Sequence, residues 1–184
     1  PLLTDAIRQN LTGAPFAGAR LLVWHRDPDH DRFQGAHMMH HPCPVDQKEI
    51  VNKVERMAGI NEHERFPLYV TTQSDRTGTV SIRAARISGT GPDLFKNANI
   101  RAQGKPAAGV EGPTVYLSDL ERKDDARIIR VAPCDTQTVW VEFNTKDAAP
   151  GVHKGEIGFS FDGVERKVEV QLNIRDVALP DYHL

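Results

Sequence analysis

The chain has 184 residues, with 23 lysines and arginines against 25 aspartates and glutamates, so its formal net charge is −2. No basic patch stands out, and because nucleic acids are bound through clustered cations, we expect no nucleic-acid partner. Hydrophobic residues make up 39% of the sequence, and without a long apolar run we expect no membrane-spanning segment.

Residues 1–60 are expected to form an N-terminal extension or insertion that packs on the rest of the chain. Residues 1–19 contain one short helical stretch, and 20–24 (RLLVW) is a short strand candidate. A polar loop follows at 26–44, and loops of that length in compact domains usually have a function or local order of their own.

This loop is rich in side chains that bind metals, because five of the eight histidines fall between residues 24 and 43. Imidazole, thiolate and thioether groups are the ligands of zinc and copper. If the loop holds such an ion, we expect the ligands to be His37, His40, His41 and Cys43. No standard ligand spacing is present, so a polar loop that wraps the fold or meets a neighbouring domain is the alternative.

The chain has two cysteines, Cys43 and Cys134, and each follows a proline. A disulfide between them is one hypothesis, which requires an oxidising compartment. Two free thiols are the other hypothesis, and the sequence leaves both open.

One helix is predicted over residues 46–58. Asp46 is a suitable N-cap, Glu49 completes a capping box, and Gly59 has the character of a C′ residue. One apolar stripe is formed at helical spacing by Ile50, Val51, Val54, Met57 and Ala58. The chain is therefore expected to be mostly β with one helix in its N-terminal third.

Residues 61–184 predict a β-sandwich domain. Short strands separated by turn residues are expected at 66–73, 79–87, 97–102, 115–117 and 127–131. Short strands with turn signals every 8–12 residues are typical of an antiparallel β-sandwich.

The clearest pattern lies near the C-terminus, where residues 139–143, 157–161 and 168–174 alternate apolar and polar side chains. Period-two alternation is typical of strands buried on one face. Asp162-Gly163 is a preferred pair for a two-residue hairpin turn. The predicted register places Phe161 opposite Val164 and brings apolar side chains to the same face.

Two blocks of sequence carry a resemblance to a known family. The first is 61–70 (NEHERFPLYV) with the strand at 79–82, and the second is 139–141 (VWV), the corner at 147–155 (DAAPGVHKG) and Leu179-Pro180. Together they resemble the N-terminal domain of the glycoside hydrolase family 123 type. The family usually has an aromatic such as tyrosine where this chain has His153.

The resemblance implies an immunoglobulin-like accessory sandwich, followed in the family by a barrel that carries the catalytic acids. No catalytic residue is therefore expected in this chain, which we interpret as a non-catalytic domain and not an enzyme. The resemblance also implies a parent protein that is exported and acts on glycans, with the adjacent domain of the same polypeptide as partner.

A carbohydrate-binding module is the alternative function. Sugar rings stack on exposed aromatic side chains, and the alternation places Trp140 and Tyr69 on the outward faces of their strands. These two residues are the predicted glycan contacts, while packing against a neighbouring segment is the other explanation for their position.

Overall fold

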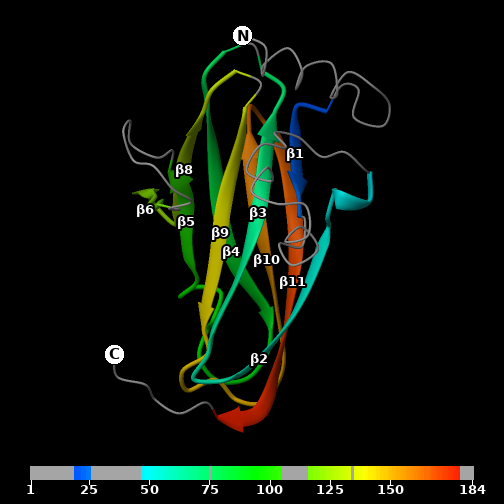
Figure 1. Ribbon diagram of the computed structural model, residues 1–184, viewed down its shortest axis with the longest axis vertical. Helices are drawn as coiled ribbons and strands as arrows, with labels where there is room; N and C mark the ends of the chain where they lie inside the picture. The colour runs from blue at the N-terminus through cyan, green and yellow to red at the C-terminus, as the bar shows by residue number, and fades with distance from the viewer. Residues whose placement is uncertain (1–18, 26–46, 75, 105–115, 134, 179–184) are drawn as a thin grey trace.

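The computed structural model of the protein describes residues 19–25, 47–74, 76–104, 116–133 and 135–178. Within these ranges the chain forms two stacked β-sheets with almost no helix. Figure 1 shows the strands running along the long axis, with β3 and β9 in front of β10 and β11. The fold is a β-sandwich, as the sequence predicted.

The described part of the chain contains eleven strands, numbered in chain order. They are β1 (Leu21–Trp24), β2 (Lys53–Ile60), β3 (His63–Thr72), β4 (Gly78–Ser88), β5 (Asn99–Gly104), β6 (Tyr116–Asp119), β7 (Glu121–Lys123), β8 (Ala126–Val131), β9 (Thr136–Asn144), β10 (Gly151–Phe161) and β11 (Val164–Ala178). A short 3₁₀ helix, η3 (Gln47–Glu49), precedes β2.

The five-stranded sheet has the order β1-β3-β9-β5-β6, and the six-stranded sheet has the order β2-β11-β10-β4-β8-β7. Neighbouring strands in the five-stranded sheet pair antiparallel. In the six-stranded sheet the same holds for every pair except β2 and β11, which are parallel. The predicted antiparallel arrangement is therefore correct except at this edge.

The predicted C-terminal hairpin is confirmed. Asp162 and Gly163 have φ angles of 48° and 77°, as a turn with two left-handed residues requires. Phe161 lies opposite Val164, and Ile157 lies opposite Val168. Turn chemistry and the apolar pattern thus specify one register, since a slip of one residue would turn every side chain to the other face.

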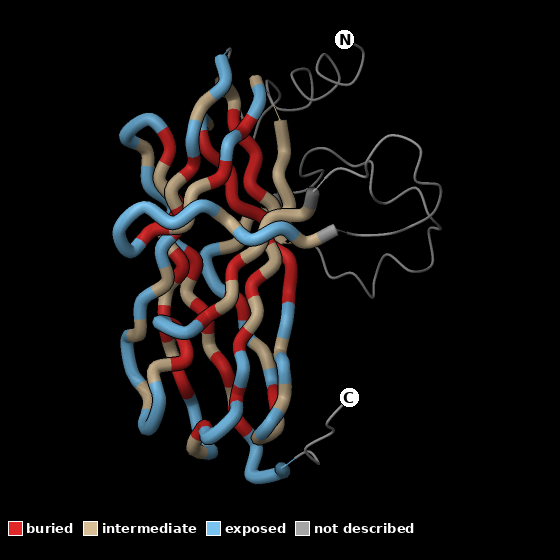
Figure 2. The backbone as a smooth tube through the Cα atoms, turned by 90° about the vertical axis from the view of Figure 1, so that its left-hand side faces the viewer, coloured by how far each residue is buried: buried red, intermediate tan, exposed pale blue. Residues whose placement is uncertain are grey.

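The core lies between the two sheets and is made of alternate residues of their strands. The predicted inward-facing residues of the last three strands are all buried: Val139, Val141, Phe143, Ile157, Phe159, Phe161, Val168, Val170, Leu172 and Ile174. In Figure 2 exposed residues gather at the loops and at the ends of the strands. This is the distribution expected when apolar burial stabilises the sandwich.

The predicted helix at 46–58 is wrong: the structure has only η3 at 47–49 and strand β2 over most of the remainder. Val54 and Ala58 face the core, whereas Met57 of the predicted apolar stripe is 58% exposed. Arg56 occupies the inward position between Val54 and Ala58. Because Arg56 is charged, the apolar residues of this strand do not show the period of two that is typical of a half-buried strand. Pairing with β11 outweighs the weak local preference for a helix.

The predicted N-terminal range contributes to both sheets. Strand β1 pairs with β3, and the segment before β2 also bonds to β1, through Val51 N–H to the Val23 carbonyl at 3.3 Å and His25 N–H to the Glu49 carbonyl at 2.9 Å. The chain then crosses over, and β2 joins the six-stranded sheet beside β11. The edge of β1 is thereby partly covered by its own chain, which protects it from pairing with another molecule.

The turn between β2 and β3 is held by the buried side chain of Thr145. Its hydroxyl oxygen accepts a hydrogen bond from Glu62 N–H at 2.8 Å and lies 2.7 Å from the Gly59 carbonyl, to which it donates. Glu62 Oε2 in turn accepts from Gly59 N–H at 2.6 Å, and Asn61 takes a φ of 62°. These bonds satisfy backbone groups that the turn would otherwise leave unpaired.

Gly155 of β10 faces the core and is required there by packing. A Cβ at this position would overlap the ring carbons of Phe95. The Phe95 ring is buried and packs edge-on against Phe143 at 5.1 Å between ring centroids, so it has no free space to move into.

Candidate functional site

The predicted metal ligands His37, His40, His41 and Cys43 lie outside the described residues, as does Cys134. In the part of the chain that is described, no group of three or more His, Cys, Asp or Glu side chains is arranged to hold a metal ion. The zinc or copper hypothesis and the disulfide hypothesis both remain predictions.

No helix among the described residues is long and apolar enough to cross a membrane. This agrees with the sequence, which contains no long apolar run.

The structure brings the two predicted glycan contacts to one surface, the outer face of the five-stranded sheet. Trp140 on β9 lies opposite Pro67 on β3, and Tyr69 is two residues further along β3. Trp140 is partly exposed, and its indole N–H donates to Gln103 Oε1 at 3.3 Å. Arg101 lies opposite Trp140 on β5, so the indole has polar side chains beside it.

Tyr69 is less available than Trp140. Its ring stacks on the indole of Trp24, with centroids 4.2 Å apart and 18° between the planes. Trp24 is 1% exposed, and its indole N–H donates to Thr71 Oγ1 at 2.9 Å. Because Trp24 covers one face of Tyr69, Trp140 is the better candidate for stacking on a ligand.

A second polar cluster, which the sequence did not predict, lies at the rim of the core where β1, β2 and β3 meet. Arg56 Nη2 donates to His25 Nε2 at 3.0 Å, and His25 Nδ1–H donates to the Pro67 carbonyl at 2.7 Å. Since Arg56 can only donate, His25 is the neutral tautomer with its proton on Nδ1. Arg56 also lies 5.4 Å from the centre of the Phe66 ring.

Glu64 completes this cluster, with its Oε1 3.7 Å from Arg56 Nε. Burial raises the pKa of the Glu64 carboxyl; Arg56 acts in the opposite direction, and the nearby Glu62 adds to the rise. The cluster joins residues of both sheets. Its contacts are internal, and we assign it a structural role.

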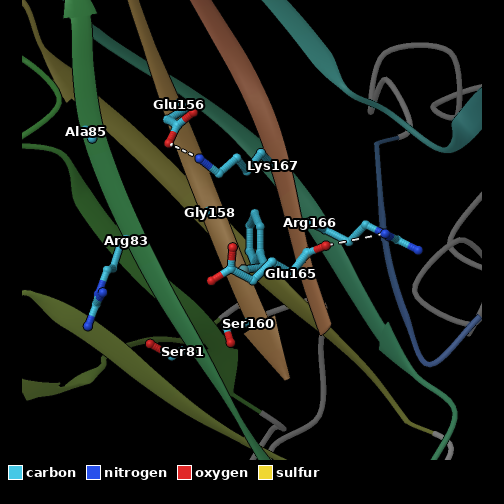
Figure 3. A pocket seen from close by; sticks show the side chains of 10 residues that line it. Ser81, Arg83, Ala85, Glu156, Gly158, Ser160, Glu165, Arg166 and Lys167 are labelled. Atoms are coloured by element: carbon cyan, nitrogen blue, oxygen red, sulfur yellow. Dashed lines mark hydrogen bonds and ion pairs between the residues drawn. The ribbon is translucent and has the colours of Figure 1, made fainter. Parts of the chain in front are cut away.

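The described surface is hollowed on the outer face of the six-stranded sheet (Figure 3). This trough has a volume of about 320 Å³, and its floor is formed by Gly158 and Ser160 of β10 beside Ser81 and Ala85 of β4. Charged residues line the trough as well: Arg83, Glu156, Glu165, Arg166 and Lys167. The Arg166 side chain extends away from Gly158 (Figure 3). It offers donors and acceptors of both charges within one small area.

The strand register, one ion pair and one side-chain position shape the trough. Gly158 lies opposite Arg83 on one side and Lys167 on the other, so a residue without a side chain separates two long ones. Lys167 Nζ forms an ion pair with Glu156 Oε1 at 2.8 Å. Figure 3 shows the Glu165 side chain extending from β11 toward Gly158.

The sequence contained one signal for this surface that was not used. Gly158 interrupts the alternating strand 157–161 at an outward position, and glycine inside a strand often marks a close approach of another group. The partner strands could not be read from the sequence, because Arg83 and Gly158 are far apart along the chain.

The comparisons with known proteins support a shared fold only. No protein-family model matches the chain, and no curated protein matches it by sequence. Among solved structures, a family 123 glycoside hydrolase from Clostridium perfringens is similar, with a TM-score of 0.56 and 13% identity. The match covers 87% of this chain but 28% of the hydrolase, so the chain spans less than a third of that protein's length.

Two other solved structures are more distant. A PapD-like domain of human CEP192 has a TM-score of 0.37 at 9% identity, over 71% of this chain and 84% of that domain. The periplasmic chaperone SfaE has a TM-score of 0.38 at 9% identity, over 71% of this chain and 57% of the chaperone.

Proposed function

We propose that this chain is a non-catalytic accessory β-sandwich domain of a larger, exported, glycan-related protein, in which it positions a neighbouring catalytic domain. The observation that supports this most is the match to the family 123 hydrolase. Nearly the whole chain aligns with a minor part of that enzyme, as expected for one module of a multidomain protein. The family resemblance of the turn at 61–64 and of the corner at 147–155 agrees with it.

The described residues of these two blocks make structural contacts that suit an accessory domain. The first block begins in the β2–β3 turn. Thr145, whose hydroxyl bonds to that turn, lies within the second block, between the strand segment 139–141 and the corner at 147–155. Within the second block His153 is buried, and its Nε2 lies 2.7 Å from the Ala149 carbonyl. These contacts of the described residues are structural and suit a non-catalytic domain.

The proposal is tested by the size and location of the natural polypeptide. We expect an antibody raised against this chain to detect, in the exported fraction of the source cells, a polypeptide much larger than 20.5 kDa. Limited proteolysis of that polypeptide should release a stable fragment that contains residues 47–178. A natural product of 20.5 kDa that stays inside the cell would contradict the proposal.

Glycan binding at Trp140 is the second candidate function. It is favoured by the position of the indole, which lies outward and partly exposed on the five-stranded sheet beside Arg101 and Gln103. Aromatic rings flanked by planar polar groups suit a sugar, whose ring face is apolar and whose edge carries hydroxyl groups. A titration with glycosides, described below, distinguishes this surface from the trough.

A further inference from the structure

The trough has at its centre a glycine that the fold itself does not require. The nearest atom to a Cβ built at Gly158 is the Arg83 carbonyl oxygen, at 4.0 Å. On the same strand Gly155 is required by the Phe95 ring, and on β4 a Cβ at Gly78 would overlap the Phe161 ring. Gly158 has neither such a neighbour nor the left-handed φ that would favour glycine.

Glycine in a strand interior weakens the strand, because it has no side chain to pack and loses more backbone freedom on folding. A glycine inside a strand often marks a bulge, a bend, or a place where a ligand or another backbone approaches closely. The pairing of β10 with β4 is regular at Gly158, and its irregularity lies between Lys154 and Gly155. Gly158 lies midway along β10, an eleven-residue strand with neighbours on both sides. The glycine therefore leaves room for a ligand over the middle of this sheet.

The charges around Gly158 restrict what that ligand can be. The Arg83 side chain is exposed and, within the described part of the chain, forms no hydrogen bond or ion pair. Glu165 extends toward the same floor from the opposite side, and Glu156 and Lys167 form an ion pair at the rim. A simple anion or cation would therefore meet fixed charges of both signs at this floor.

A neutral molecule with many hydroxyl groups can form hydrogen bonds with all of these side chains together. Each hydroxyl both donates and accepts, so it can accept from Arg83 or Lys167 and donate to Glu165 or Glu156. Bonds to charged groups are stronger than neutral ones. The volume of about 320 Å³ is at the small end of the range of about 300–1,000 Å³ for ligand pockets.

We propose that the trough over Gly158 binds a neutral sugar residue of a glycan, with one edge of the ring held by Arg83 and the other by Glu165. The choice of a glycan among neutral polyhydroxyl ligands rests on the proposed function. The trough is an open hollow in the sheet surface and not an enclosed pocket, so we expect weak binding, with a dissociation constant on the order of 1 mM. A weak site of this kind would raise the local concentration of glycan near a linked domain.

The test is a nuclear magnetic resonance titration of the isotope-labelled chain with the methyl glycosides of glucose, galactose, mannose, N-acetylglucosamine and N-acetylgalactosamine. We expect at least one glycoside to produce saturable shifts of the amide signals of Gly158, Ser160 and Ser81. Gly158→Leu fills the floor without removing a polar group and should weaken binding at least about tenfold, equivalent to about 1.4 kcal/mol. Arg83→Met should weaken binding as well.

Val152→Leu is the matched control, because it enlarges an exposed outward residue of the same strand away from the trough. It should leave the shifts unchanged, and thermal unfolding should show that all three variants remain folded. Shifts produced by triglycine but by no glycoside would overturn the proposal. Glycoside shifts confined to the Trp140 indole N–H would overturn it in favour of the five-stranded sheet, and neither result would affect the case for an accessory domain.

Discussion

Replacing Gly155 by alanine is expected to destabilise the sandwich by about 3 kcal/mol, at the upper end of the range for an overfilled core. The added methyl group would overlap the ring of Phe95, and three of its carbon atoms are the nearest neighbours of the new Cβ. Phe95 is 2% exposed and is held edge-on against Phe143, so relief would require movement of the backbone. Urea denaturation of wild type and variant measures the difference.

The same strand supplies a control on its opposite face. Gly158→Ala adds the same methyl group where the nearest atom is 4.0 Å away, so its stability should equal that of wild type or exceed it slightly. If both variants lost the same stability, the strand would tolerate no added side chain on either face. The packing of Phe95 against Gly155 would then be contradicted.

Thr145→Val is the second large effect, with an expected loss of about 2–4 kcal/mol from two unpaired backbone groups. Valine has nearly the shape of threonine, so packing is kept while the hydroxyl is lost. The Glu62 N–H would lose its acceptor and the Gly59 carbonyl its donor. Thr145 is fully buried, so water cannot replace the hydroxyl without rearrangement.

Two further variants separate the hydroxyl from the methyl group. Thr145→Ser keeps the hydroxyl and should retain most of the stability, although it removes a buried methyl group. Thr138→Val, on the outer face of β9, should cost little, because no comparable pair of backbone bonds depends on it. A Thr145→Val variant as stable as wild type would contradict the assignment of this residue as the clamp of the β2–β3 turn.

The parts of the fold that were predicted correctly depend on local information. Asp162-Gly163 and the alternating residues on either side of it are contiguous in the chain, so turn type and register could be predicted together. The helix at 46–58 failed because the same residues fit two periods. Val54 and Ala58 are four apart, which suits one face of a helix as well as alternate inward positions of a strand.

Only tertiary contacts decide between these two interpretations. Arg56 faces inward in β2 because His25, Glu64 and the Phe66 ring contact it there. Glu64 and Phe66 belong to β3, and His25 directly follows β1. A charged residue at an inward position is expected only where such partners exist. The sequence carried no sign that β1 and β3 would supply them.

The candidate site was predicted less well than the fold. Alternation along single strands placed Trp140 and Tyr69 on outward faces, and the structure puts them on one sheet surface. The alternation pattern could not show that Trp24 would stack on Tyr69. The trough depends on the register of β4, β10 and β11, which brings Arg83, Gly158 and Lys167 into one row. The local sequence pattern does not determine which residues of distant strands pair with one another.

The chain forms a stable β-sandwich, and we propose that it serves a larger glycan-related protein without performing the reaction itself. We propose that its described surface binds a sugar at Gly158, with Trp140 as the alternative position. Its buried polar groups, by contrast, are used to hold turns and strand edges together. The interpretation separates binding from catalysis, and that separation can be measured.

The most direct measurement compares glycosidase activity, on chromogenic glycosides, of three proteins: the intact natural polypeptide, the polypeptide lacking this domain, and the 184-residue chain alone. We expect the intact polypeptide to hydrolyse a glycoside, the shortened one to be slower or less stable, and the isolated chain to show no turnover above buffer. Hydrolysis by the isolated chain, lost in a variant of a trough residue such as Glu165→Gln, would contradict the account.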